Sequence, residues 1–376
     1  MYACCFHFDC HIHDSIIHTY SKFSFFILQK LKIEMRLTLS ASYIGQKKNG
    51  SIQHPSRSLL YKHDDDVRQE MLAIQFIETC DRILKASGLD LKIKTYRCMP
   101  VAEKRGFIEW VPGTVSMSEI CKPIGSLLTD PKSSGLSDDE KYNPSNVGEA
   151  NGGAFLRLGD WCKYESLRAL RKTPASKDKI GLSGDNPVQE FLRASSFEKA
   201  APYLIRKEVM ENYIKSCAGY SVITYLLGVG DRHTDNLLLH QDGYFLHCDY
   251  TFLLGQDPKT YMPMRVTTQM VNGMGGCESD NFAKFLSLMG AAFTALREHT
   301  SVRTLLSLVR ILSTIDLPSL CVSQTPDEAL RNMLQRFRLD LSNDEAVEFI
   351  EGVVHESINS KMWFAVDVMH DIGKRL

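Results

Sequence analysis

The sequence of 376 residues lacks an excess of charge of one sign, a long apolar run and a cysteine framework. Its 44 Lys and Arg are balanced by 45 Asp and Glu, so the chain has no overall attraction for nucleic acid, and any anionic partner must be met locally. No apolar run approaches the ~18 residues that a membrane span needs. The 11 cysteines include no C-x-x-C pair, which argues against disulfides and favours a reducing cytosolic compartment. We therefore expect a soluble intracellular protein.

The composition is otherwise that of a globular protein, with 44% apolar and 24% charged residues. At ~150 residues per domain, the length predicts two or three folding units or one bilobed enzyme. The N-terminal stretch 1–34 is unusual, because it mixes aromatic and histidine residues without a helical or strand period. His7, Cys10, His11 and His13 are of the types that ligate zinc, but their spacing matches no familiar zinc site, and an unstructured extension is the alternative.

Hydrophobic periodicity predicts a small sheet and one helix early in the chain. Strands are expected at 36–44, 58–61, 91–96 and 106–111. A helix is expected after the acidic run 64–66, because apolar residues from Val67 to Leu84 repeat near one face. Further helices are expected at 188–193, 211–227, 280–298, 303–315, 326–337 and 343–355.

This layout divides the chain into four segments. Residues 1–34 are an atypical extension, 35–120 a lobe of sheet and helix with a hinge, 121–186 a partly disordered insertion, and 187–376 a mostly helical lobe. The insertion is rich in Gly, Ser, Asn and Asp and has little to bury. The sequence therefore predicts an α+β fold with a small N-terminal lobe and a larger helical lobe.

The clearest chemical signal lies between Gly230 and Asp249. Two short apolar strands, 237–239 and 244–248, are joined through an Asp-Gly turn. A hairpin of this kind brings Asn236 and Asp249 together, so that their oxygens can share a hard cation such as Mg²⁺. Asp231 precedes Asn236 by five positions, the spacing that protein kinases use. Any one of these residues alone is most often a solvated turn residue, but three at this spacing favour phosphoryl transfer.

Phosphoryl transfer also needs a cation on the ATP phosphates and a carboxylate that orients this cation. Lys62 stands at the end of a predicted strand, and Glu70 lies within the following helix. Alone, Lys62 would be interpreted as a surface lysine. Together with the downstream motif, the two residues predict a phosphate-binding pair.

The order Asp231-Arg232-His233-x-x-Asn236 resembles the phosphatidylinositol 3-/4-kinase superfamily rather than ordinary protein kinases. The resemblance runs from about Tyr61 to Leu376, interrupted by the insertion, and it is closest to class III phosphatidylinositol 3-kinase. It implies a bilobed protein-kinase-like fold, with ATP and Mg²⁺ or Mn²⁺ as cofactors. Further matching segments are 215–220, 228–233, 255–259, 273–276 and 337–342.

The resemblance also implies roles for individual residues. Segment 61–70 matches the family's Phe-Lys-x-Gly-Asp-Asp-Leu-Arg-Gln-Asp, which implies that Lys62 holds ATP phosphate and that Glu70 pairs with it. Segment 106–111 matches the hinge, where backbone groups of Glu109 and Val111 would bind adenine. The remaining implied roles are Tyr96 at the back of the adenine pocket, Leu238 and Cys248 at its floor, Asp231 and His233 as acid/base groups near the inositol hydroxyl, and Asn236 and Asp249 on the metal.

His233 is the favoured proton acceptor, because an unperturbed imidazole titrates near neutral pH. The alternative is a histidine that only hydrogen-bonds the backbone. His247, in the second strand of the hairpin, is interpreted as structural.

The segment after Asp249 is expected to select the lipid, because extra phosphates on the inositol ring would need clustered cations. Between residues 256 and 265 the only cations are Lys259 and Arg265, which are the substrate-binding candidates. So few cations favour unmodified phosphatidylinositol. The last helix, apolar at positions 365, 368, 369 and 372, either packs on the large lobe or contacts a membrane.

The resemblance implies a cytoplasmic enzyme, bound peripherally to endosomal or autophagic membranes, that makes phosphatidylinositol 3-phosphate. The implied partners are phosphatidylinositol membranes, a regulatory protein-kinase-like subunit, and autophagy or trafficking subunits. No nucleic-acid partner is expected.

Two departures from the family pattern leave other functions open. Asp64 replaces a Gly and places negative charge near the phosphates, and Thr251 replaces the Gly of Asp-Phe-Gly. If that position needs a positive φ, a β-branched residue there would cost ~1–3 kcal/mol. The alternatives are a Ser/Thr protein kinase of the related large-kinase group and a catalytically weak scaffold.

Overall fold

The computed structural model describes the backbone of residues 5–11, 34–42, 57–63, 65–121, 186–257, 262–312, 325–360 and 363. Side chains are described from residue 59 onward within these ranges, that of Leu312 excepted. The zinc hypothesis at residues 7–13, Asp64, Lys259, the insertion between 122 and 185, and the helix expected at 365–376 therefore lie outside the described side chains.

An antiparallel sheet of five strands forms the N-terminal part, in the order β1-β2-β3-β5-β4. Its strands are β1 (Cys5–His11), β2 (Glu34–Ser42), β3 (Arg57–His63), β4 (Cys98–Ala102) and β5 (Arg105–Glu109). β2, β3 and β5 match expected strands, whereas β1 lies in the stretch for which the sequence shows no period. In β3, Lys62 stands opposite Gly106 and Leu59 opposite Glu109, so β3 and β5 set Lys62 and the hinge at fixed positions.

The strand expected at 91–96 is absent, because this segment runs along a helix instead of joining the sheet. Lys92 has a φ of +55°, which interrupts the extended backbone. The hydroxyl of Tyr220 donates to the carbonyl oxygen of Lys94, and Leu91 is 1% exposed. The alternation of apolar residues in 91–96 therefore reflects contact with α7 (Lys207–Leu227). The next strand, β4, begins at Cys98.

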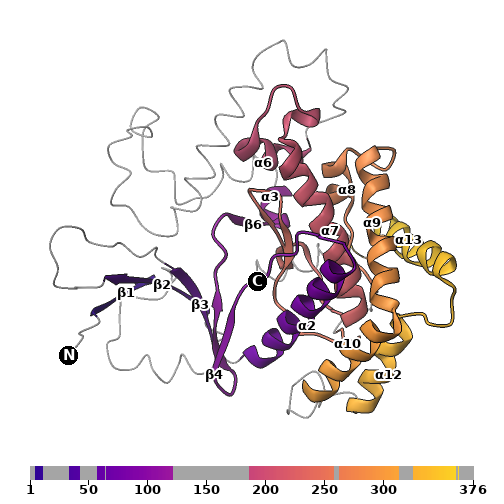
Figure 1. The fold of residues 1–376 in the computed structure, drawn as a ribbon. Coiled ribbons are helices and arrows are strands. Elements are labelled where there is room, and N and C mark those ends of the chain that lie inside the picture. The colour runs from indigo at the N-terminus through magenta and orange to yellow at the C-terminus, as the bar shows by residue number, and fades with distance from the viewer. Residues whose placement is uncertain are drawn as a thin grey trace.

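Helix α2 (Val67–Ala86) follows the acidic run as predicted. The side chain of Asp66 caps it by accepting the amide N–H of Arg68 at 3.1 Å. α2 contacts β4 and β5 on one side and α7, α9 and α10 on the other, so it joins the sheet to the helical lobe (Figure 1). A Cβ at Gly106 would lie 2.7 Å from the Cβ of Val67, so only glycine allows this approach of β5 to α2.

A second sheet carries the predicted hairpin. It contains β6 (Thr114–Ser116), β7 (Leu237–His240) and β8 (Phe245–His247), paired antiparallel in that order. The hairpin of β7 and β8 confirms the expectation from the Asp-Gly turn. β6 is too short to show alternation and was not expected. It leads into α3 (Met117–Cys121), and the segment from the hinge through β6 joins the two lobes.

The helical lobe is built around α7, most of whose residues from Val209 to Leu227 are buried. A helix with an apolar surface all round belongs in the core of a lobe, where α9 and β8 pack against it. The 3₁₀ turns are η5 (Pro202–Leu204) and η6 (Thr234–Asn236). The other helices are α6 (Pro187–Ser196), α8 (Thr268–Met274), α9 (Asp280–Arg297), α10 (His299–Leu312), α12 (Pro326–Arg336) and α13 (Asn343–Asn359).

The fold class is therefore as predicted, an α+β bilobed arrangement with a small sheet-plus-helix lobe and a larger helical lobe (Figure 1). The helices named above fall at expected positions, except α3 with five residues and α8 with seven, which were not expected. Within the described ranges, no helix combines the length and apolar content needed to cross a bilayer.

Candidate active site

The loop after α7 carries the two predicted acid/base residues. Asp231 has a positive φ of +50°, a conformation that an L-residue adopts only when its surroundings fix it. The carboxylate of Asp257 accepts the amide N–H of Asp231 at 3.1 Å. One residue earlier, the N–H of Gly230 donates to the carbonyl oxygen of Phe252 at 3.0 Å. The segment 249–257, called the activation segment below, therefore holds this loop in place.

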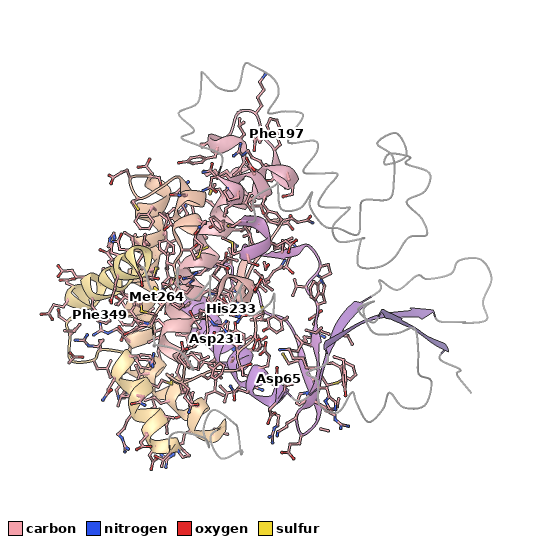
Figure 2. The ribbon with its side chains drawn as sticks, turned by 180° about the vertical axis from the view of Figure 1, so that it is seen from behind. Asp65, Phe197, Asp231, His233, Met264 and Phe349 are labelled. Carbon is pink, nitrogen blue, oxygen red and sulfur yellow. The ribbon has the colours of Figure 1, made fainter. Side chains whose placement is uncertain are left out.

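The structure brings Asp231 and His233 together. Nε2 of His233 lies 4.0 Å from Oδ2 of Asp231, and its Nδ1 lies 3.8 Å from Oδ2 of Asp235. Figure 2 shows Asp231 and His233 close together, between the helices and the strands. An imidazole between two carboxylates can take up a proton and keep the resulting cation paired, which is what general-base catalysis requires.

The hairpin of β7 and β8 places the predicted metal ligands at its open end. Leu237 stands opposite His247, and the N–H of Cys248 donates to the carbonyl oxygen of Asn236 at 3.1 Å. The Asn236 amide nitrogen donates to the carbonyl oxygen of Asp231 at 3.1 Å, which leaves the amide oxygen as the ligand for a cation. Asp249 follows directly after Cys248 in the chain.

This donor set fits Mg²⁺ or Mn²⁺ bound together with nucleotide phosphates. Among the described side chains there is no group of three or more His, Cys, Asp or Glu residues that could hold a metal alone. Mg²⁺ in nucleotide sites is commonly held by one or two protein oxygens, with phosphates and waters completing the shell. Asn236 and Asp249 supply two such oxygens, so the residues present fit the ion.

One buried arginine ties the loop to the hairpin. Arg232 is 3% exposed, and its Nε donates to the carbonyl oxygen of Gly230 at 2.8 Å. Its Nη1 donates to the carbonyl oxygen of Cys248 at 2.8 Å, and its Nη2 donates to that of Asp249. The rigid fork of a guanidinium allows these contacts at once. Asp249 has a φ of +58°, and Arg232 holds this conformation.

The Asp249 carboxyl remains ionised, as a metal ligand must. Burial raises its pKa, but the Lys62 ammonium, a hydrogen bond from Thr251 and the Arg232 guanidinium outweigh burial and bring the pKa below its ordinary value. The residues around Asp249 therefore stabilise its charge before any cation binds.

Lys62 differs from the expectation in its partner. It is 7% exposed, and its Nζ forms an ion pair with Oδ2 of Asp65 at 3.2 Å. The expected partner, Glu70, accepts the hydroxyl of Tyr96 and the N–H of Tyr250, the latter at 2.8 Å. These two donors hold the Glu70 carboxylate in place, and Asp65 lies three residues from Lys62. Burial raises the pKa of Glu70 and Lys62 lowers it, so the two remain coupled through charge.

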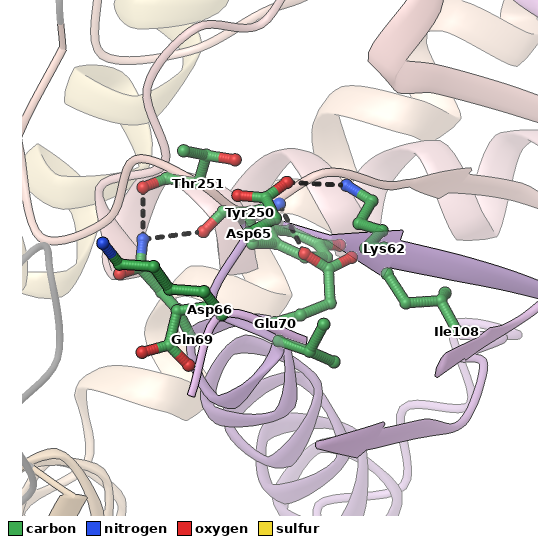
Figure 3. A pocket seen from close by; sticks show the side chains of 10 residues that line it. Lys62, Asp65, Asp66, Gln69, Glu70, Ile108, Tyr250 and Thr251 are labelled. Atoms are coloured by element: carbon green, nitrogen blue, oxygen red, sulfur yellow. Dashed lines mark hydrogen bonds and ion pairs between the residues drawn. The ribbon is translucent and has the colours of Figure 1, made fainter. Parts of the chain in front are cut away.

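A cavity of about 260 Å³ opens beside Lys62, where β3, the start of α2 and the activation segment meet (Figure 3). The hinge and Asp231 do not line this cavity, so it adjoins the predicted nucleotide site rather than containing all of it. The lining residues are Lys62, Asp65, Asp66, Val67, Gln69, Glu70, Lys104, Ile108, Tyr250 and Thr251.

The predicted hinge, residues 106–111, overlaps the end of β5. The N–H of Glu109 donates to the carbonyl oxygen of Arg97 at 2.8 Å, and the carbonyl oxygen of Val111 accepts the hydroxyl of Thr114 at 2.7 Å. An adenine edge at the hinge would therefore use the other two backbone groups, the carbonyl of Glu109 and the N–H of Val111. Tyr96 is buried behind this site, and its hydroxyl is bound to Glu70.

The predicted floor of the adenine pocket lies on the second sheet. Leu238 is half-buried in β7 opposite Leu246, and Cys248 is half-buried just after β8. Burial raises the pKa of the Cys248 thiol to about 12, so it remains protonated and acts as a small apolar side chain. The structural interpretation of His247 agrees with its position: it is 1% exposed and stacks on Tyr220 with ring centroids 5.5 Å apart.

The structure removes the expected strain at Thr251. Among residues 249–251 the positive φ belongs to Asp249, and Thr251 is not among the residues with positive φ. The side chain of Gln69 donates to the carbonyl oxygens of Tyr250, at 3.0 Å, and of Thr251. Helix α2 thus supports the activation segment directly, and a β-branched residue fits there.

Of the two substrate-binding candidates, the structure describes Arg265. Lys259 lies outside the described residues. Arg265 is 4% exposed, and its guanidinium lies 4.3 Å from the centre of the Trp363 ring. This position gives Arg265 a packing role, and its role in substrate binding stays a prediction.

Sequence reasoning missed Gln69, Asp257 and the tethering role of Arg232. All three lie within the segments that match the family. Their partners are backbone groups, some of them far away in the sequence, and no motif identifies such groups. Gln69, for example, binds backbone about 180 residues away. Only the fold brings such groups together.

Comparison with known proteins agrees with this geometry. The family model described as "Phosphatidylinositol 3- and 4-kinase" matches residues 56–310, more than half of the chain. The chain is 32% identical over 320 residues to "Phosphatidylinositol 3-kinase VPS34" of Candida albicans, covering 84% of this chain and 30% of the relative. It is 28% identical over 348 residues to the protein of the same name from Saccharomyces cerevisiae, covering 92% and 31%.

A third relative, "Phosphatidylinositol 3-kinase pik3" of Schizosaccharomyces pombe, is 30% identical over 317 residues, covering 84% of this chain and 32% of the relative. The chain thus spans about a third of the length of these relatives. On the family match, the identities and the site, the chain belongs to the phosphatidylinositol 3- and 4-kinase family.

Proposed function

We propose that this chain transfers the γ-phosphoryl group of ATP to the 3-hydroxyl of phosphatidylinositol, giving phosphatidylinositol 3-phosphate. The observation that carries the proposal is the buried Arg232, which joins the loop of Asp231 to the backbone of Asp249. Membership of a kinase family supports ATP and a divalent metal ion. The names of the relatives support the lipid and the 3-position.

Each residue of the site has a separate role in the proposed phosphoryl transfer. The inositol oxygen attacks the γ-phosphorus, the bond from that phosphorus to the bridging oxygen breaks, and ADP leaves. His233 takes the hydroxyl proton, and Asp231, 4.0 Å away, pairs with the imidazolium that forms. Lys62 exchanges Asp65 for phosphate oxygens. Bound by Asn236 and Asp249, Mg²⁺ or Mn²⁺ supplies neutralisation of the phosphate charge.

The preference for unmodified phosphatidylinositol rests on the few cations near the activation segment. An additional phosphate on the ring would need a compensating cation. We therefore propose that the 4-phosphate and the 4,5-bisphosphate are poor substrates.

The cellular setting is proposed from the family resemblance. We place the chain in the cytoplasm, peripherally bound to endosomal or autophagic membranes, where phosphatidylinositol is its membrane partner. The proposed protein partners are a regulatory protein-kinase-like subunit and autophagy or trafficking subunits.

A comparison of substrates tests the proposal. The purified chain is given Mg²⁺-ATP or Mn²⁺-ATP with vesicles of phosphatidylinositol, its 4-phosphate or its 4,5-bisphosphate, or with a generic protein substrate. We expect product from unmodified phosphatidylinositol, none with Asp249→Asn, and unchanged product with the exposed control Asp340→Asn. Phosphoprotein without phospholipid would favour the protein-kinase alternative. No product and no stabilisation by Mg²⁺-ATP in a thermal shift would favour the scaffold.

A further inference from the structure

The hydroxyl of Thr251 contacts the predicted metal ligand. Oγ1 of Thr251 donates a hydrogen bond to Oδ1 of Asp249 at 2.5 Å. The family's Asp-Phe-Gly has a glycine at this position and has no hydroxyl to offer. The feature is therefore specific to a residue in which this chain departs from the family pattern.

This hydrogen bond acts on the rotation of the Asp249 carboxylate, together with a hydrogen bond from the backbone of Thr251. The terminal torsion of an aspartate joins an sp³ to an sp² carbon and has broad minima, so the carboxylate plane turns easily unless an oxygen is held. A hydroxyl donating to Oδ1 of Asp249 fixes that plane. The second oxygen, Oδ2, is then the one that faces a ligand.

The backbone on either side of Asp249 is already held by other groups. Arg232 donates to the carbonyl oxygen of Asp249, Glu70 accepts the N–H of the next residue, and Gln69 donates to the carbonyl oxygen of Thr251. Removal of the Thr251 hydroxyl would therefore leave the path of the chain intact. What it would remove is the side-chain donor, so that the Asp249 carboxylate is held against rotation by the backbone of Thr251 alone.

We propose that Thr251 is a positioning residue: its hydroxyl fixes the Asp249 carboxylate so that Oδ2 is presented to the divalent cation. The proposal rests on the proposed function, since it requires Asp249 as a metal ligand. Partners that hydrogen-bond metal ligands commonly contribute ~10- to 100-fold to metal affinity. Thr251 is such a partner within the activation segment.

Mn²⁺ binding tests this without catalysis. The free Mn²⁺ signal in electron paramagnetic resonance is followed as the full chain is titrated with Mn²⁺, in the presence of a non-hydrolysable ATP analogue. The variants are Thr251→Val, which keeps the shape and removes the hydroxyl, and Thr251→Ser, which keeps the hydroxyl. Thr294→Val is the matched control, because the hydroxyl of Thr294 bonds only within helix α9, to the carbonyl oxygen of Gly290.

We expect Thr251→Val to weaken Mn²⁺ binding ~10- to 100-fold, while Thr251→Ser and Thr294→Val bind like the wild type. The unfolding midpoint without metal should be the same in all four proteins. Equal Mn²⁺ affinity in Thr251→Val and the wild type would overturn the inference alone. Mn²⁺ binding that is weakened as much in Thr251→Ser as in Thr251→Val would also overturn it. The same holds if Thr251→Val loses Mn²⁺ affinity and its unfolding midpoint falls as well. A wild type without Mn²⁺ binding, or unchanged binding in Asp249→Asn, would overturn the proposed function as well.

Discussion

The guanidinium of Arg232 donates a hydrogen bond to the backbone carbonyl oxygen of Asp249. The residue next to the predicted catalytic Asp231 thus holds the backbone of the predicted metal ligand. The acid/base loop and the end of the hairpin are thus joined by one side chain. This coupling predicts that changes at Arg232 affect both stability and metal use.

Arg232→Lys tests the tether. One ammonium cannot reproduce the contacts of the guanidinium with the carbonyl oxygens of Gly230, Cys248 and Asp249. Since hydrogen bonds involving a charged group contribute ~1.5–3 kcal/mol each, we expect the free energy of unfolding to fall by about 2 kcal/mol or more. We also expect kcat to fall and the Mg²⁺ concentration at half-maximal rate to rise. Urea unfolding and a Mg²⁺ titration of activity measure these effects.

The exposed Arg82 provides the control, because its side chain bonds only to the neighbouring Thr79. Arg82→Lys should leave both quantities unchanged. Normal Mg²⁺ dependence in a folded Arg232→Lys protein would contradict the tethering role.

Asp257 predicts a selective effect on kcat. Its carboxylate accepts the N–H of Asp231, the residue whose φ is +50°. Asp257→Ala removes this acceptor and should lower kcat about tenfold with little change in the KM for ATP, because the nucleotide contacts lie elsewhere. Asp257→Asn keeps an oxygen acceptor and should retain most activity. A larger effect of Asp257→Ala on KM than on kcat would disagree with this account.

Glu70 predicts a dependence of stability on pH. Burial raises its pKa above the ordinary 4.5, against the effects of Lys62 and two hydrogen bonds. The folded state then binds the proton more tightly than the unfolded chain. Its contribution to stability is present below pH 4.5 and is lost as pH rises through the raised pKa.

The measurement is urea unfolding of wild type and Glu70→Gln over a range of pH that starts near 4.5. The stability of the wild type relative to Glu70→Gln should decline with rising pH. A difference from Glu70→Gln that is independent of pH would show that the folded and unfolded pKa values are equal.

The ion pair of Lys62 with Asp65 predicts competition with ATP. Because the Lys62 ammonium must exchange Asp65 for phosphate, Asp65→Asn should lower the KM for ATP several-fold with kcat nearly unchanged. Asp90→Asn, which affects only an exposed pair with Lys92, is the control. Steady-state kinetics with varied ATP measure the KM. A higher KM for ATP in Asp65→Asn would contradict competition and would mean that Asp65 supports the nucleotide site.

Sequence periodicity predicted the helical lobe and the hairpin because these features are local. The Asp-Gly turn and the apolar strands around it specify the hairpin within about twenty residues. The segment 91–96 shows the limit: its alternation is real, but its apolar side chains pack against α7 rather than belonging to a sheet. A period-two pattern reports burial on one face and does not identify the partner.

The site was predicted as a set of residues, but not as a set of contacts. Spacing and family resemblance named Lys62, Asp231, His233 and Asp249, whereas the roles of Gln69 and Asp257 depend on segments that meet only in the fold. Sequence also could not show that Lys62 forms an ion pair with Asp65, or that Glu70 accepts hydrogen bonds from Tyr96 and Tyr250. Strain at Thr251 was expected for a similar reason, since sequence cannot show which residue of the segment takes the positive φ.

The most direct test of the central claim is the position of the transferred phosphate. Phosphatidylinositol vesicles are incubated with labelled ATP, Mg²⁺ and either wild type or Asp249→Asn, and the labelled position on the inositol ring is determined. The account predicts label at the 3-position from wild type and none above background from Asp249→Asn. Label at another position, or equal product from the two proteins, would contradict it.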